Sequence, residues 1–293
     1  MAHYRIVHTT NYDYSDPVPV CHNQLHLSPR DTDWSRCTSH RLAIDPTPMH
    51  VSRRSDWFGN YVKSFSLQEN HQKLCVTARS RVEVTPQAVP GISDAPSWEK
   101  IASRMNEQTD ECIFRASEFL YDSPHISRGE AFREFAAECF NPGDSILAAT
   151  IALTSKIHGE FQFGARATTV TTRPEEVLVS KHGVCQDFAH LAISSLRSLG
   201  IPARYVSGYL RTTPPAGQPR LIGADASHAW FSVFCGEHGW IDFDPTNNRL
   251  CDTDHIPIAW GRDYSDVTPV RGVFIGGGNH TLTVSVDVEP IAN

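Results

Sequence analysis

Hydrophobic and polar positions alternate through much of the first 86 residues, and a period of two predicts β-strands. Aromatic and β-branched residues concentrate in these segments, and turns that contain Pro, Gly or Asn separate them. The predicted strands span residues 4–14, 23–27, 41–44, 60–67 and 73–84. Several short strands at this spacing are typical of an antiparallel β-sandwich, so residues 1–86 are predicted to form a β-rich N-terminal domain.

Beyond residue 98 the apolar residues recur at steps of three and four, which predicts α-helices. A segment rich in Pro, Gly and Ser at residues 87–97 precedes them and is predicted to be a linker. The predicted helices span residues 111–121, 129–140, 145–158, 174–180 and 185–199. Further strands are predicted at residues 203–210, 228–234, 240–243, 272–275 and 280–288, with a loop at residues 212–219. Residues 98–293 are therefore predicted to form a second domain.

Composition limits the classes of partner. The chain has 293 residues, a net charge of −7 and interspersed acidic and basic residues, so we expect a soluble globular protein that does not bind nucleic acid. No apolar run reaches the ~18 residues that a membrane span needs. The N-terminus lacks the apolar core of a signal peptide, so a cytoplasmic location is expected. The eight cysteines are scattered without tight spacing and are expected to be free thiols.

One of these cysteines, Cys185, lies at the predicted start of a helix that ends at Gly200. A thiol at a helix N-terminus lies near the positive end of the peptide dipoles, which favours the thiolate. The thiolate is the nucleophilic form, so this position suits attack on a carbonyl carbon. A helix-start cysteine is also compatible with simple packing in the core, so the prediction depends on residues farther along the chain.

A base and an orienting carboxylate are predicted from a hairpin. A nucleophilic cysteine needs both groups. His228 begins one predicted strand and Asp244 ends the next, and a turn at residues 236–239 would place these strand ends side by side. The rival carboxylates are Asp225, Asp242 and Asp252. Asp242 has the same side-chain parity as Asp244, but Asp244 precedes Pro245 at the strand end, where active-site groups tend to lie.

The three segments around these residues resemble the motifs of the transglutaminase-like superfamily. They are residues 183–190 (GVCQDFAH), 227–230 (SHAW) and 240–246 (WIDFDPT). Residues 8–12, 58–60 and 261–267 further resemble its bacterial branch, which carries a β-rich domain before the core. The resemblance implies an α+β protein, in which an antiparallel β-sandwich precedes a papain-like core of helices packed on an antiparallel sheet. It also implies Cys185 as nucleophile, His228 as base and Asp244 as the orienting residue.

The chemistry implied by the resemblance is acyl transfer or hydrolysis at an amide bond, as in cross-linking enzymes, peptidases and deamidases. The expected partner is a peptide or protein amide substrate, and no cofactor is expected. The backbone N–H of Cys185 is a candidate oxyanion donor, with Gln162 and His182 as candidates for the second donor on position alone.

Three alternatives remain open. Cys235, His238, Cys251 and His255 have spacings that resemble those of zinc ligands, although the strand predicted between them argues against a zinc site. The fold could also serve as a binding module in which the three residues are idle. Finally, arylamine acetyltransferases share a Cys-His-Asp triad, and in that case the acyl donor would be a thioester cofactor.

Overall fold

The structure, a computed structural model, describes residues 1–107, 110–164, 168–212 and 226–291. Asp225 and residues 213–219 of the predicted loop lie outside this described part.

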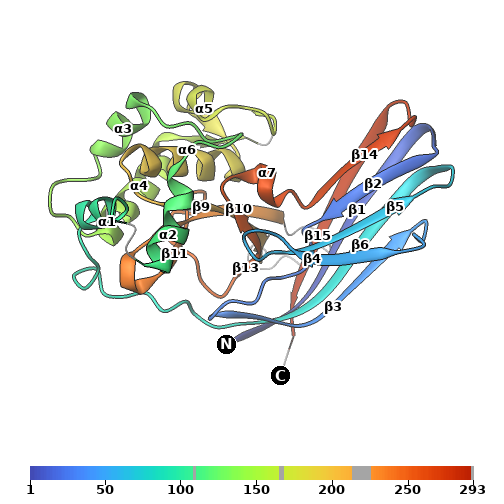
Figure 1. Cartoon of the computed structure of the whole chain (residues 1–293), viewed down its shortest axis with the longest axis horizontal. Coiled ribbons are helices and arrows are strands. Elements are labelled where there is room, and N and C mark those ends of the chain that lie inside the picture. Colours follow the sequence, from blue (N-terminus) through green and yellow to red (C-terminus); the bar gives the residue numbers. More distant parts are fainter. Residues whose placement is uncertain (108–109, 165–167, 213–225, 292–293) are drawn as a thin grey trace, which may run out of the picture.

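Two four-stranded antiparallel sheets pack face to face and form a sandwich, at the right of Figure 1. The sheets have the strand orders β15-β1-β6-β3 and β14-β2-β5-β4. Their strands are β1 (Ala2–Val18), β2 (Val20–Leu25), β3 (Ser35–Asp45), β4 (Val51–Ser55), β5 (Tyr61–Leu67), β6 (His71–Val84), β14 (Val270–Ile275) and β15 (His280–Pro290). Apolar side chains of both inner faces, such as Leu74, Val76, Leu25 and Phe65, fill the space between them.

The last two strands of the chain belong to this sandwich. β14 pairs with β2, and β15 pairs with β1 over eleven residues, from Tyr4↔Pro290 to Tyr14↔His280. The sequence predicts that residues 98–293 form one domain, whereas the strands β14 and β15 of this range belong to the sheets of the N-terminal sandwich. Pairing between residues at least 245 positions apart leaves no local signal, so the sequence predicts these strands but not their location.

In the second part of the fold, helices pack on a five-stranded antiparallel sheet. The strand order of this sheet is β12-β11-β10-β9-β13. These strands are β9 (Ala203–Leu210), β10 (Ala226–Phe234), β11 (Trp240–Asp244), β12 (Arg249–Leu250) and β13 (His255–Gly261). The helices are α1 (Trp98–Arg104), α2 (Glu111–Ser117), α3 (Glu130–Ala137), α4 (Ile146–Glu160), α5 (Pro174–Ser180), α6 (Cys185–Ser198) and α7 (Tyr264–Val267). Helix α6 packs against β9 and β10 on one side and against α3, α4 and α5 on the other, so it is the central helix of the core.

The α+β architecture predicted from the sequence is confirmed, but the two-residue strands β7 (Gln162–Phe163), β8 (His182–Gly183) and β12 and two longer strands, β4 and β13, were not predicted. β4 is exposed at all five of its positions, so it has no alternating pattern to detect. β13 contains Pro257, which lacks an N–H group and argues against a central strand. In the structure β13 is an edge strand, and its register with β9 shifts between Pro257 and Ala259.

Apolar and polar contacts fix the sandwich to the core. Tyr4 and Ile6 of β1 pack on Tyr209, Ile256 and Ile258 of the core sheet. Nearby, the buried Asn60 side chain accepts a hydrogen bond from the Trp260 N–H at 3.0 Å and donates one to the Trp260 carbonyl at 2.8 Å. The Asn60 side-chain amide thus makes the two hydrogen bonds to Trp260 of β13 that the backbone of a neighbouring strand would make.

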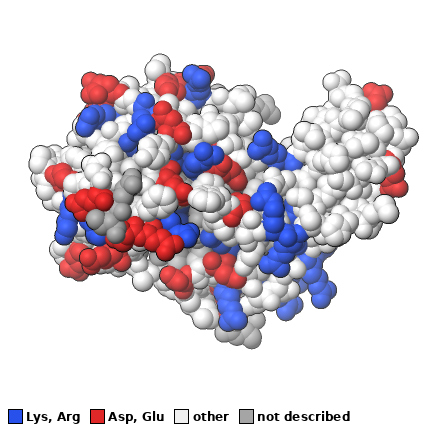
Figure 2. Space-filling model, viewed as in Figure 1, with Lys and Arg blue, Asp and Glu red and all other residues white. Residues whose placement is uncertain are grey.

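Acidic and basic side chains are interspersed over the helical part in the view of Figure 2. Among the described residues, no helix is both long and apolar enough to cross a membrane.

Two glycines provide a matched test of this packing. A Cβ at Gly208 on β9 would lie 2.3 Å from Trp230 and 2.4 Å from the Ile256 carbonyl, whereas a Cβ at Gly159 in α4 would meet nothing within 4 Å. We expect Gly208→Ala to lower the free energy of unfolding by about 1–3 kcal/mol through overpacking. Gly159→Ala should raise it by about 0.5–1 kcal/mol, because Ala favours the helix. Urea unfolding of both variants measures this, and equal effects would contradict the packing around Gly208.

Candidate active site

Cys185 is the first residue of α6, where local contacts fix the start of the helix. The backbone N–H of Val184 donates to Asp187 Oδ2 at 2.8 Å, and the Thr168 hydroxyl donates to the same oxygen at 2.6 Å. Gly183 permits this close turn, since a Cβ there would lie 2.8 Å from the Asp187 Cβ. The backbone N–H of Cys185 is among the first four of the helix, which have no intrahelical acceptor. It is therefore free to donate to a ligand beside the thiol.

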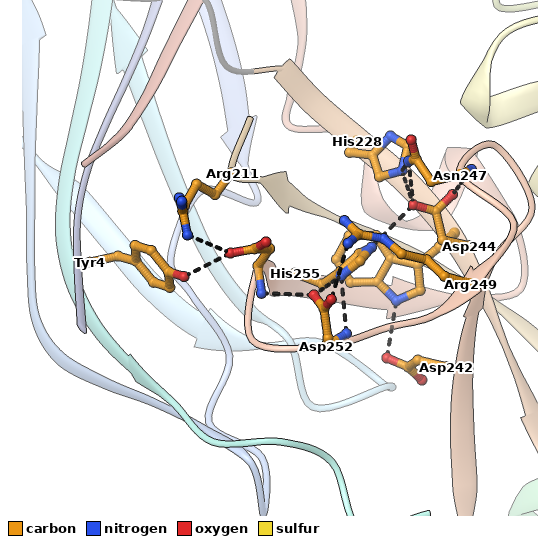
Figure 3. A network of polar contacts seen from close by, with 11 residues as sticks. Tyr4, Arg211, His228, Asp242, Asp244, Asn247, Arg249, Asp252 and His255 are labelled. Atoms are coloured by element: carbon orange, nitrogen blue, oxygen red, sulfur yellow. Dashed lines mark hydrogen bonds and ion pairs between the residues drawn. The ribbon is translucent and has the colours of Figure 1, made fainter. Parts of the chain in front are cut away.

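His228 and Asp244 meet across the β10–β11 ladder. The ladder pairs Phe231 with Phe243, so the two residues are diagonal neighbours. The His228 Nε2–H donates to Asp244 Oδ2 at 2.8 Å, and both side chains are buried (Figure 3). The hairpin predicted from residues 236–239 thus gives the expected proximity.

Asp242 and Asp252, the two rival carboxylates within the described residues, have partners other than His228. Asp242 is buried and accepts hydrogen bonds from Trp230 Nε1 at 3.0 Å and from the Ser232 hydroxyl. Asp252 accepts from Arg249 at 3.0 Å and contacts His255 Nδ1 at 3.0 Å. Asp244 is therefore the carboxylate that orients His228.

Cys185 and His228 line one cavity of about 300 Å³. Because His228 Nε2 is bonded to Asp244, Nδ1 is the ring nitrogen left for the thiol. Burial lowers the pKa of His228, but hydrogen bonds to Asp244 and Cys185 raise it more, so that the pKa is about 10. His228 is consequently an imidazolium at neutral pH, the form that gives a proton to a leaving group.

A second imidazole, which no sequence pattern indicated, binds the same carboxylate. His255, the first residue of β13, donates through Nε2 to Asp244 Oδ2 at 3.1 Å, and its ring is fully buried. The Asn247 side-chain amide donates to the same oxygen at 2.6 Å. Burial raises the pKa of Asp244, but the bonds from His228, His255 and Asn247 outweigh it and hold this pKa well below its usual range. Asp244 is therefore ionised at any working pH.

The zinc site considered from the sequence is not assembled. Cys235 is buried, His238 is exposed and contacts the Asp94 carbonyl at 3.3 Å, and His255 is bonded to Asp244. Among the described residues, the one group of three or more metal-ligand side chains that lie close together is His228, Asp244 and His255. Their facing atoms are already joined by hydrogen bonds, which accounts for the cluster without an ion.

Gln162 and His182, the candidates for a second oxyanion donor, lie beside each other in the short parallel ladder of β7 (Gln162–Phe163) and β8 (His182–Gly183). Both side chains are exposed, and neither lines the cavity that holds Cys185. Gln186, which the sequence did not single out, does line it. The role of Gln162 and His182 stays a prediction.

The opposite side of the cavity comes from the sandwich. His8, Thr10 and Tyr12 of β1 and Leu282 and Val284 of β15 line it. A signal for part of this wall was present in the sequence, since residues 8–12 belong to the opening that resembles the bacterial branch. It did not show that these side chains face Cys185.

The raised pKa of His228 predicts a pH dependence of stability. A group whose pKa rises from ~6.5 in the unfolded chain to about 10 in the folded protein stabilises the fold below pH ~6.5 and loses this contribution as pH rises toward 10. We expect the free energy of unfolding to fall over this window, and to fall less in His228→Gln. Urea titrations measure both, with His238→Gln, at an exposed histidine, as the control that keeps the wild-type slope. Equal slopes in all three proteins would contradict the pairing.

Comparison with known proteins identifies the family. Residues 4–83 match the bacterial transglutaminase-like N-terminal region, and residues 133–245 match the transglutaminase-like superfamily. An uncharacterized protein of Mycobacterium tuberculosis is 41% identical, over 98% of this chain and 92% of that protein. A protein-glutamine gamma-glutamyltransferase of Pseudomonas aeruginosa is 38% identical over 23% of this chain and 10% of its own length.

Among solved structures, a protein from Cytophaga hutchinsonii named as a candidate cysteine protease has the same fold. Its TM-score is 0.74 at 21% identity, over 100% of this chain and 92% of that one. The matched range 133–245 contains Cys185, His228 and Asp244. The chain belongs to the transglutaminase-like superfamily, in its bacterial form with an N-terminal β-rich region.

Proposed function

We propose that this protein is a cysteine-dependent enzyme that acts on amide bonds through a thioester, either as a hydrolase or as an acyltransferase. One observation carries the proposal: Cys185 and the imidazolium of His228 line the same cavity, and His228 is oriented by a fully buried carboxylate. A nucleophile, a proton donor and an orienting group are the parts that acyl transfer needs.

In the first half of the reaction the Cys185 thiolate attacks the amide carbonyl carbon and a C–S bond forms. The negative charge moves to the carbonyl oxygen, which the backbone N–H of Cys185 at the start of α6 is placed to stabilise. The C–N bond then breaks as His228 gives its proton to the nitrogen. The amine leaves, and an acyl thioester remains on Cys185.

In the second half, water or an amine attacks the thioester carbonyl and gives its proton to neutral His228. The C–S bond breaks, and the thiolate and the imidazolium are restored. Asp244 stays ionised throughout, because its low pKa follows from three hydrogen bonds that the reaction does not break.

The first substrate class to test is the glutamine side-chain amide of a peptide. The name of the Pseudomonas aeruginosa relative specifies glutamine as the acyl donor of that protein. We extend this to the present chain as a proposal, since the cavity contains the groups needed for an amide of either a side chain or a main chain.

Mass spectrometry tests the proposal directly. The protein is incubated with a peptide library rich in glutamine, with and without a primary amine, and both intact protein and peptides are weighed. Cleavage, deamidation and amine incorporation give different mass changes. Cys185→Ala should lower product formation by at least ~1000-fold, whereas Cys112→Ala, at an exposed cysteine, should leave it unchanged. An acyl adduct that persists in Cys185→Ala would contradict the assignment, and a wild-type thiol inert at neutral pH would favour a binding module.

A further inference from the structure

One face of β1 changes its partner along the strand. At one end Tyr4 and Ile6 pack on the core sheet, and at the other Tyr14 packs inside the sandwich. Between them His8, Thr10 and Tyr12 point to the same side and line the cavity of Cys185. In this middle part His8 contacts Tyr209 of the core sheet and Tyr12 packs at the edge of the sandwich core, so the cavity lies where the two partners of the strand meet.

The adjacent strand extends this surface. In the β1–β15 ladder Thr10 lies opposite Val284 and Tyr12 lies opposite Leu282. Both apolar side chains line the cavity and are about half exposed, with relative exposures of 51% for Val284 and 50% for Leu282. Thr10, Tyr12, Leu282 and Val284 thus form a largely apolar patch that carries the hydroxyls of Thr10 and Tyr12, and we call it the β-wall.

Hydrogen bonds determine the direction in which the Thr10 hydroxyl donates. The buried Tyr209 hydroxyl has one partner among the described residues, His8 Nδ1 at 2.9 Å, so its proton points to that nitrogen. Burial lowers the pKa of His8 to about 4, and the ring is neutral at physiological pH. With Nδ1 accepting, the proton of His8 is on Nε2, which donates to Thr10 Oγ1 at 2.9 Å. The Thr10 hydroxyl proton is then left to donate into the cavity.

The lining of the cavity also indicates the charge of what it binds. Apart from the reacting groups of Cys185 and His228, the described residues that line it carry no charge at neutral pH, since they include no Asp, Glu, Lys or Arg and His8 is neutral. At about 300 Å³ it lies at the small end of ligand sites. A short neutral group with a carbonyl oxygen matches this size and the oriented hydroxyl of Thr10.

We propose that the β-wall binds the acyl part of the substrate, with the Thr10 hydroxyl donating to a carbonyl oxygen of that acyl group while Tyr12, Leu282 and Val284 contact its carbon skeleton. His8 and Tyr209 are positioning residues that fix the direction of the donor. This inference rests on the proposed function, because it assigns the acyl selectivity of the same site.

Two isosteric probes test it. The 4-nitrophenyl esters of 4-oxopentanoic acid and 4-methylpentanoic acid differ by one oxygen in place of a methyl group, and release of 4-nitrophenolate reports acylation of Cys185. Thr10→Val should lower kcat/KM for the oxo ester about 3–10-fold, the range for a lost neutral hydrogen bond. The kcat/KM of the same variant for the 4-methylpentanoic ester should stay within about twofold of the wild-type value.

Two further variants separate recognition from structure. Thr10→Ser keeps the hydroxyl and should retain the wild-type ratio of the kcat/KM values for the two esters. Tyr209→Phe removes the donor to His8 Nδ1, lets the ring proton move there and should lower the ratio as Thr10→Val does. Equal losses for both esters in Thr10→Val, or no loss for either, would overturn the assignment.

A binding measurement distinguishes this inference from the proposed function. Cys185→Ala protein, which cannot form a thioester, is titrated with 4-oxopentanamide by NMR, with and without Thr10→Val. Weaker binding in the double variant supports the β-wall even if the wild-type protein acylates with neither ester, in which case the proposed function alone fails. Equal affinity of the two proteins rules out the β-wall.

Discussion

The buried carboxylate of Asp244 imposes the strictest requirement on the candidate active site. An ionised group without solvent contact must be paired and fully hydrogen bonded, or the fold loses several kcal/mol, about 3–5 by the usual magnitudes. Asp244 accepts from His228, His255 and the Asn247 amide through Oδ2, and from the backbone N–H groups of Thr246 and Asn247 through Oδ1. These donors come from β10, β13 and the turn after β11. A single charge therefore holds three segments together and sets the position of the imidazole beside Cys185.

The same network reaches the sandwich. His255 contacts Asp252, whose Oδ1 accepts the backbone N–H of Asp254 at 2.9 Å. The Asp254 carboxylate in turn accepts from Tyr4 of β1 at 3.1 Å and from Arg211 at 3.0 Å, and Figure 3 labels both of these donors. Tyr209 adds a second link through His8. Both walls of the cavity are thus tied to the strands that carry His228 and its partners, so the position of β1 over the thiol follows from the same contacts that orient His228.

The sequence predicted what local patterns control. The start of α6 followed from helical spacing before Gly200, and the proximity of His228 to Asp244 followed from a hairpin with four turn residues. His255 was missed as a partner of Asp244, because Pro257 hides its strand and because its spacing from Cys251 suggested a zinc ligand instead. The location of β14 and β15 was missed for a different reason: their partners are at the other end of the chain. Period-two patterning does show that His8, Thr10 and Tyr12 share a face. It cannot show which part of that face lines the cavity.

The part of this face that lines the cavity results from a mismatch in strand length. β1 has 17 residues, which at ~3.3 Å per residue is about 55 Å, whereas β2 in the facing sheet has six residues, about 20 Å. The inner face of β1 therefore extends beyond the sandwich and needs another cover. The core sheet covers Tyr4 and Ile6, and the remaining stretch lies over the N-terminus of α6. Such a cavity has one wall made by a β-ladder and one made by Cys185 and His228. Because the two walls use different residues, the acyl selectivity proposed above could be altered by substitutions at alternate positions of β1 and β15 that leave Cys185 and His228 in place.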